Sequence, residues 1–185
     1  PIKKTIIKEK SLESQVLETY KEGMEALNDG DVLFAAKKFN EAEILFPQAD
    51  SAPQSALMAA YSYYTQDYYG DAVAELKRFL KVYPSYKDLG YVYYLLAICY
   101  YEQIVDEKKD LQSIVNAKKN FNIILKDYPN TEYAIDAEFK IDFIVSAVFT
   151  GRVLFSTTIV YPFAFIATSL AQASTHLKSL VSPAP

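Results

Sequence analysis

The segment AVAELKRFLKVYP, residues 72–84, decides the fold because two other segments share its pattern. AAKKFNEAEILFP covers residues 35–47, and AKKNFNIILKDYP covers residues 117–129. Each segment begins with alanine, places a bulky apolar residue four positions later, and ends with an aromatic residue and proline. The apolar residues recur at intervals of three and four, which is typical of an amphipathic helix. Three such helices of equal length indicate an internal repeat.

Proline marks the end of each unit, because it cannot donate the next helical hydrogen bond and disfavours helical conformation in the residue before it. The three unit-ending prolines are Pro47, Pro84 and Pro129. Thirteen residues after the first two stand Ala60 and Ala97, and Gly23 holds the equivalent place in the first unit. Small residues at these places would let a neighbouring helix approach closely. Each unit is therefore expected to contain two helices, a first helix with the small residue and a second helix that ends before proline.

The spacing of the prolines reveals one insertion. Pro47 and Pro84 are 37 positions apart, whereas Pro84 and Pro129 are 45 apart, so eight residues are inserted at about 104–113. The turn NDGD at 28–31 separates the first two helices, and we expect Gly30 to adopt the left-handed conformation there. Paired helices, a small residue and a closing proline are the pattern of the tetratricopeptide repeat, although its usual period is about 34.

We therefore predict an all-α fold, an α-solenoid of tetratricopeptide-like helix-turn-helix repeats with three repeats and the start of a fourth. An unrelated helical bundle is the alternative. Residues 1–11 are predicted to be a linker, and the repeat domain spans 12–144. The expected repeats are 12–49, 50–86, 87–130 and a partial unit at 131–144. The expected helices lie near 12–28, 32–46, 53–66, 70–83, 89–104, 114–127 and 131–144.

Composition excludes several classes of function. The chain of 185 residues has 5 glycines, which argues against glycine-rich phosphate loops, and its net charge of −4 offers no electrostatic footprint for nucleic acid. The single cysteine, Cys99, excludes an internal disulfide and a cysteine-based zinc site, and its apolar context predicts a buried, inert thiol. No catalytic constellation forms around Cys99 or the only histidine, His176. We predict a binding protein that is not an enzyme and uses no metal or cofactor.

One stripe of the first helices is rich in tyrosine and carries no formal charge. Counting from each small residue, positions six and three before it and one and four after it share this side of the helix. Tyrosine combines a large flat surface with a polar tip and is enriched at interfaces. The stripe is predicted to line a concave groove for extended peptides; the alternative is that its tyrosines are half-buried packing residues. The predicted binding residues are Tyr20, Met24, Leu57, Tyr61, Tyr64, Tyr91, Tyr94, Ile98 and Tyr101. The opposite stripe, with Ala56, Ala59, Ala60 and Tyr63 and then Tyr93, Leu96, Ala97 and Tyr100, is expected to pack between helices.

The end of the chain departs from the repeat pattern. All 23 acidic residues lie at or before Asp142, and the segment 145–185 is hydrophobic without a repeat signature. Three hypotheses remain open for this tail. It is the product of a shifted reading frame, it is a membrane-inserted segment at 153–177, or it is a pair of helices that caps the solenoid.

The extended repeat resembles the BamD family, outer-membrane lipoproteins of the β-barrel assembly machinery. The stretch AYSYYTQDYYGDAVAELKRFLKVYPSYKDLGYVYYLLAICYY at 60–101, the insertion IVDEKKDLQSIVNAKKNF at 104–121 and YPNTEYA at 128–134 carry the resemblance. In the insertion, Lys109 stands where the family tends to have arginine in a turn. The insertion residues Lys109, Asp110 and Gln112 are hypothesised to contact a partner.

The resemblance implies a function. A scaffold of this family would bind other subunits of the barrel-assembly complex and extended segments of unfolded outer-membrane proteins. It would lie at the periplasmic face of the outer membrane, held by a lipidated cysteine that would precede Pro1. Two alternatives stay open: a periplasmic tetratricopeptide protein that coordinates envelope constriction, and a generic peptide-binding co-chaperone. A co-chaperone that clamps acidic tails needs Lys or Arg on the concave stripe, which has none.

Overall fold

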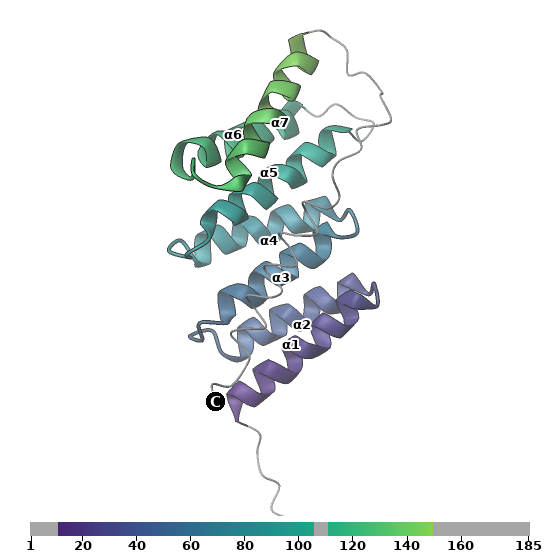
Figure 1. Cartoon of the computed structure of the whole chain (residues 1–185). Helices are drawn as coiled ribbons and strands as arrows, with labels where there is room; N and C mark the ends of the chain where they lie inside the picture. The colour runs from purple at the N-terminus through teal and green to yellow at the C-terminus, as the bar shows by residue number, and fades with distance from the viewer. Residues whose placement is uncertain (1–10, 106–110, 150–185) are drawn as a thin grey trace, which may run out of the picture. The chain divides into compact units, whose positions relative to one another are not determined.

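Alternating first and second helices build the repeats, as the sequence predicts (Figure 1). The computed structural model describes residues 11–105 and 111–149, which form seven α-helices and no strand. The helices are α1 (Leu12–Asn28), α2 (Val32–Leu45), α3 (Ala52–Tyr64), α4 (Tyr69–Val82), α5 (Leu89–Val105), α6 (Leu111–Asp127) and α7 (Glu132–Phe149). The chain divides into two compact units, Pro1–Ser146 and Ala147–Pro185, and the helical repeats belong to the first.

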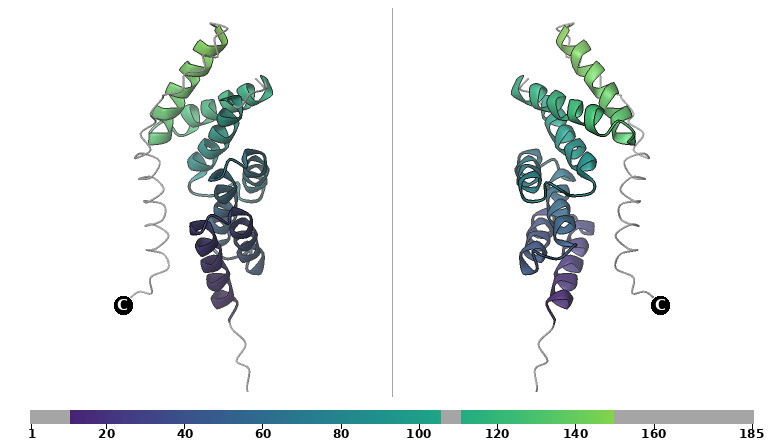
Figure 2. Two further views of the ribbon diagram at one scale, coloured as in Figure 1. Left: turned by 90° about the vertical axis from the view of Figure 1, so that its right-hand side faces the viewer. Right: turned by 90° about the vertical axis from the view of Figure 1, so that its left-hand side faces the viewer.

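Consecutive helices pack on one another from α1 to α6, so each helix pair stacks on the next (Figure 2). The three second helices α2, α4 and α6 each end two residues before the unit-ending proline. The bulky residue four positions after the alanine is fully buried in each of them. These residues are Phe39, Leu76 and Phe121. The fold is thus a tetratricopeptide-like solenoid of three helix pairs, and α7 opens a fourth unit.

Local signals place the helix ends. The Ser11 hydroxyl accepts a hydrogen bond from the Ser14 amide at 3.3 Å, and the Asp31 carboxylate accepts one from the Phe34 amide at 3.1 Å. Both side chains cap amides that have no partner within the helix. In the turn between α1 and α2, Gly30 has φ +83°, the left-handed conformation that the NDGD sequence predicts.

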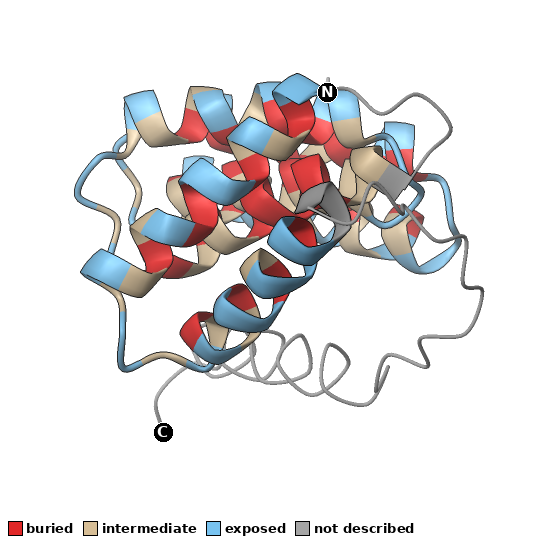
Figure 3. Cartoon of the chain, turned by 90° about the horizontal axis from the view of Figure 1, so that it is seen from above, coloured by how far each residue is buried: buried red, intermediate tan, exposed pale blue. Residues whose placement is uncertain are grey.

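Gly23 shows why a small residue recurs in the first helices. A Cβ atom on Gly23 would stand 2.9 Å from Cε1 of Phe39, so the backbone of α1 lies directly against this ring. The equivalent residues Ala60 and Ala97 are completely buried. The opposite stripe also packs as expected, since its alanines, Leu96 and Tyr100 are buried and Tyr63 and Tyr93 are half-buried. Figure 3 shows that the buried stretches of the described helices lie where helices face one another.

The insertion lengthens two helices instead of forming a long loop. Helix α5 runs eight residues past Ala97, whereas α3 runs four residues past Ala60. Helix α6 begins six residues before Ala117, whereas α4 begins three residues before Ala72. The predicted start of the sixth helix at 114 was therefore three residues late. Residues 111–116 contain no glycine or proline, so nothing in them interrupts the helix.

Helix α7 continues past the predicted end at 144 to Phe149, because no helix breaker occurs before Gly151. The first residues of the predicted tail are therefore helical. Ala134 and Ala137 are buried, whereas Ile135 and Phe139 on another side of the helix are 76% and 64% exposed. The remaining tail, including the candidate membrane segment at 153–177, lies outside the described residues, as does nearly all of the predicted linker. Within 11–105 and 111–149, no helix is both long enough and apolar enough to cross a membrane.

Candidate functional site

Five tyrosines of three consecutive units, four of them in the predicted stripe, form two groups of neighbouring rings. Tyr61 and Tyr64 on α3 have ring centroids 6.2 Å apart. On α5, Tyr91 and Tyr94 lie 5.7 Å and 5.1 Å from the ring of Tyr133 on α7. Tilted ring pairs at these separations are favourable beyond the area that they bury. We call these five residues the tyrosine surface.

The five residues of the tyrosine surface are half-buried, so each is partly packed against the protein and partly exposed. Burial raises the pKa of Tyr61, and the pKa of Tyr91 is raised far above its usual value by burial and then by neighbouring hydroxyls, first that of Tyr61. Burial also raises the pKa of Tyr133 to about 12. These phenols therefore stay neutral at physiological pH and keep a hydroxyl proton that can be donated.

Other predicted stripe residues are less available. Ile98 and Tyr101 are only 6% and 4% exposed, so in this structure they serve packing. The ring of Tyr101 contacts Phe121 and Phe143 at 6.3 Å each. Met24 and Leu57 are half-buried and pack beside the core. Fewer residues of the predicted stripe are therefore accessible than the sequence pattern indicates.

Tyr20, at the α1 end of the predicted stripe, has a distinctive environment. Its ring packs edge-on against Phe39 at 5.1 Å, and its hydroxyl oxygen is buried without a hydrogen-bond partner in the described part of the chain. Burial, and then the nearby Tyr86, raise the pKa of Tyr20 to about 12. An unpaired buried hydroxyl costs free energy, so Tyr20 would gain from a ligand or water that reaches it.

Carboxylates border the tyrosine surface, and the sequence stripe did not include them. Tyr94 donates a 2.7 Å hydrogen bond to Oδ2 of Asp136 on α7. Near Tyr64, the Tyr69 hydroxyl donates to Oδ1 of Asp67 at 2.7 Å, and the rings of Tyr64 and Tyr69 lie 6.1 Å apart. Asp136 follows Tyr133 by three residues, a spacing that places both on one side of a helix and could have revealed the pair.

The hypothesised contact in the insertion falls partly outside the described residues, which include neither Lys109 nor Asp110. Gln112 lies exposed in the first turn of α6, where its amide donates to Oδ1 of Asn116 at 3.2 Å. Of the three residues hypothesised to contact a partner, only Gln112 lies in the described part of the chain.

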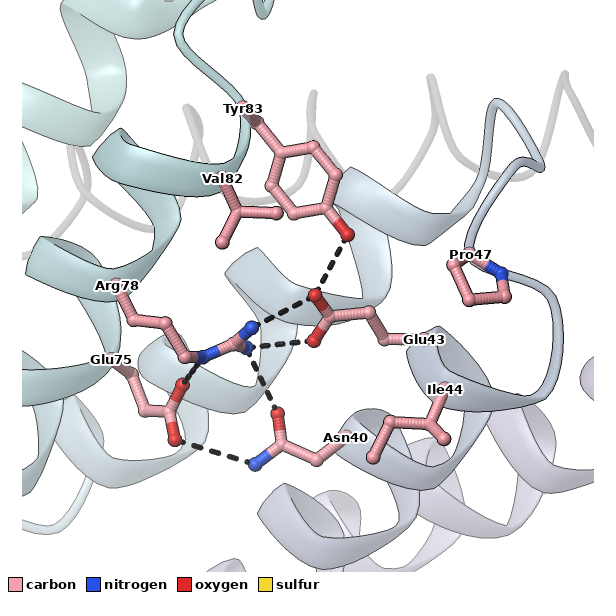
Figure 4. Close-up of a pocket in the computed structure, with 8 residues that line it drawn as sticks. All are labelled: Asn40, Glu43, Ile44, Pro47, Glu75, Arg78, Val82 and Tyr83. Carbon is pink, nitrogen blue, oxygen red and sulfur yellow. Dashed lines mark hydrogen bonds and ion pairs between the residues drawn. The ribbon is translucent and has the colours of Figure 1, made fainter.

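A cavity lies between helices α2 and α4, the second helices of the first two repeats (Figure 4). Arg78 donates to both oxygens of Glu43 at 2.9 Å and 2.7 Å and to Glu75 at 2.8 Å, while the Tyr83 hydroxyl donates to Glu43 at 2.7 Å. These polar groups satisfy one another, and their network ties the first repeat to the second. The cavity, of about 380 Å³, is lined by Asn40, Glu43, Ile44, Pro47, Glu75, Arg78, Val82 and Tyr83.

Within the described ranges, no three His, Cys, Asp or Glu side chains are grouped so that they could hold a metal ion. Cys99 is buried, and burial followed by the charge of Glu102 raises its pKa to about 12. A thiol with such a pKa is inert as a nucleophile at neutral pH.

Comparison of the sequence with known protein families identifies the family of this chain. A family profile described as "YfiO: Outer membrane lipoprotein" matches residues 12–148. The chain belongs to the YfiO family. The match covers all seven described helices except the last residue of α7.

Several relatives of this YfiO-family chain are named outer membrane protein assembly factor BamD. The relative from Caulobacter vibrioides is 37% identical over 125 residues, which are 68% of this chain and 41% of the relative. The relative from Rickettsia prowazekii is 35% identical over 125 residues, covering 68% of this chain and 50% of the relative. The relative from Neisseria gonorrhoeae is 27% identical over 138 residues, covering 69% and 52%. The chain spans about half the length of the relatives that it matches, or less.

Proposed function

We propose that this protein is a non-enzymatic scaffold in the assembly of outer-membrane β-barrel proteins and that its tyrosine surface holds extended segments of those proteins before they fold. The observation that carries the proposal is the run of half-buried rings across three units, Tyr61 and Tyr64, Tyr91 and Tyr94, and Tyr133. The relatives named as outer membrane protein assembly factors support the same role.

The chemistry of the surface suits an extended chain. An unfolded segment offers peptide N–H and C=O groups along its length, and neutral tyrosine hydroxyls can pair with the carbonyls. Alternate side chains of such a segment point the same way, so its apolar residues can lie on successive rings. Stacked repeats present such surfaces as one extended face.

The proposal includes partners and location. Solenoids bind through extended surfaces, so we propose that other subunits of the barrel-assembly complex contact this one, with the insertion around Gln112 as one contact. The description of the family as outer membrane lipoproteins supports a position at the periplasmic face, held by a lipid anchor.

Binding of a labelled peptide tests the proposal. The probe is a peptide with the sequence of the C-terminal strand of an outer-membrane β-barrel protein, and fluorescence anisotropy reports its Kd. The double variant Tyr64→Ala and Tyr94→Ala removes two rings, and we expect it to weaken binding by about five- to 150-fold, since ring contacts contribute about 0.5–1.5 kcal/mol each.

The matched control is Ile44→Ala with Val82→Ala, which removes two exposed apolar side chains beside the cavity of the second helices. This variant should bind as the unchanged protein does. Circular dichroism and thermal melting establish that both variants are folded. Unchanged affinity in a folded Tyr64 and Tyr94 variant would contradict the proposal.

A further inference from the structure

We propose that the segment held by the tyrosine surface is selected for a basic side chain, whose cationic end lies beside Glu102 and Asp67 while the neighbouring apolar side chains lie on the rings. This inference rests on the proposed function and names the chemistry of its ligand. The inference is based on charge complementarity between the carboxylates Glu102 and Asp67 and a Lys or Arg side chain.

Glu102 is the first element of the argument. It is half-buried at the end of α5, and among the described residues it accepts no hydrogen bond and forms no ion pair within 4 Å. A partly buried carboxylate without such partners is costly, because it has lost water, and the positive charge of nearby Lys140 offsets this cost only in part. A cation or a hydrogen-bond donor that approaches Glu102 would therefore stabilise its carboxylate.

Glu102 also lies next to the tyrosines. Burial and then its negative charge raise the pKa of Tyr64, and burial, the hydrogen bond to Asp67 and then Glu102 raise the pKa of Tyr69. Asp67 is exposed and has φ +63°, in the turn that joins α3 to α4. Two carboxylates and two aromatic rings therefore converge from α3, its turn, α4 and α5.

Lys140 provides an example of the proposed recognition inside this protein. Its ammonium nitrogen lies 4.9 Å from the ring centroid of Tyr101 and 3.6 Å from Oδ2 of Asp136. Lys140 is buried, so a cation is already held between a tyrosine ring and a carboxylate at this side of the solenoid. A basic side chain from a ligand beside Tyr64, Tyr69 and Glu102 would make the same pair of contacts.

The charges along this side favour a cation over an anion. Asp67, Glu102 and Asp136 are opposed only by Lys140 among the groups that the contacts above bring together. An acidic segment would meet like charges and would be rejected. A metal ion has less support than a basic side chain, because the described residues contain no cluster of three metal-binding side chains.

Two peptides of equal shape test the inference. Each is an extended peptide with alternating apolar and aromatic residues; one carries a central arginine, and the other carries citrulline, which has the same shape without the charge. The Kd of each peptide for the full 185-residue chain is measured by fluorescence anisotropy at low and high salt. We expect the arginine peptide to bind about five- to tenfold tighter at low salt, and this ratio should shrink as salt screens the charges.

The variant Glu102→Gln should bring the ratio of the two affinities close to one, whereas Glu25→Gln should leave the ratio unchanged. Glu25 is an exposed carboxylate on α1, so the control alters the net charge equally. Melting curves accompany both variants, and Glu102→Gln should not lower the melting temperature because it removes a half-buried charge.

The outcomes separate the inference from the proposed function. If both peptides bind the unchanged protein equally, the selection for a basic residue is refuted and peptide binding stands. If Glu25→Gln reduces the ratio as much as Glu102→Gln does, the preference reflects net charge and the site is refuted. If neither peptide binds, the proposed function fails together with the inference.

Discussion

Replacing Gly23 with alanine tests how closely α1 and α2 approach. The new Cβ would stand 2.9 Å from Cε1, 3.0 Å from Cδ1 and 3.2 Å from Cζ of Phe39. Carbon atoms normally rest about 3.5–4.0 Å apart, so the ring must move by roughly half an ångström. Phe39 is completely buried and packs edge-on against Tyr20, which leaves the ring little room to move.

The expected loss of stability in Gly23→Ala is estimated by comparison with a second glycine-to-alanine variant. Gly70→Ala in α4 would place its Cβ in open space, with no other atom within 4 Å. Alanine favours a helix over glycine by up to about 1 kcal/mol, a gain that both variants share in part. Overpacking a core costs about 1–3 kcal/mol, so Gly23→Ala should be less stable than Gly70→Ala by about that amount.

Urea unfolding followed by circular dichroism at 222 nm measures the two free energies of unfolding. Gly70→Ala should be as stable as the unchanged protein or slightly more stable, and Gly23→Ala should be less stable than Gly70→Ala. The ring of Tyr20 should also change its environment in the Gly23 variant, which near-ultraviolet circular dichroism detects. Equal stability of the two variants would refute the close approach of the helices.

Three further predictions concern the core, the ion-pair network and the thiol. Leu76→Ala should lower the free energy of unfolding by about 2–5 kcal/mol in a urea titration, because Leu76 is fully buried. Val82 is exposed, so Val82→Ala should change this free energy by less than about 0.5 kcal/mol. Similar losses in the two variants would contradict the placement of Leu76 in the core. Burial alone would raise the pKa of Glu43, but the hydrogen bonds from Arg78 and Tyr83 outweigh it and lower that pKa below 4.5. Its stabilising effect is therefore present above pH 4.5 and is lost as the pH falls through the folded-state pKa, so the difference in unfolding free energy between the unchanged protein and Glu43→Gln should shrink below that pH; a difference independent of pH would argue against the network. Cys99, whose pKa burial and then Glu102 raise to about 12, should resist a thiol reagent at pH 8 until urea unfolds the protein, and rapid labelling of the folded chain would show that the thiol is accessible.

The helical repeats could be predicted because their signals are local. An aromatic residue before Pro84 and the left-handed Gly30 each act within a few residues of the chain, and the structure confirms their roles at the helix ends. The small residue at Ala60 is buried, as its equivalence to Gly23 predicts. The length added by the insertion and the long fifth helix were predicted correctly. The sixth helix was predicted to start three residues late, because a segment without glycine or proline extends a helix as readily as it forms a loop.

The surroundings of the tyrosine surface could be predicted only in part. Tyr61, Tyr64, Tyr91 and Tyr94 follow from helical spacing within α3 and α5. Tyr133 and the carboxylates come from other helices and from a turn, so their proximity depends on how the units stack. Spacing within one helix also gave no sign that Tyr101 would be buried under Phe143, about forty residues later.

The packing of each helix mainly on its neighbours in the chain gives the solenoid a mechanical property. A force applied along the stack acts on the α2–α3 and α4–α5 contacts in series, and small rotations at each contact add into a larger change of curvature. A change of curvature would alter the distance between the rings on α3 and those on α5. If the tyrosine surface holds an extended segment as proposed, a partner that bends the stack would change the spacing of the rings that contact this segment.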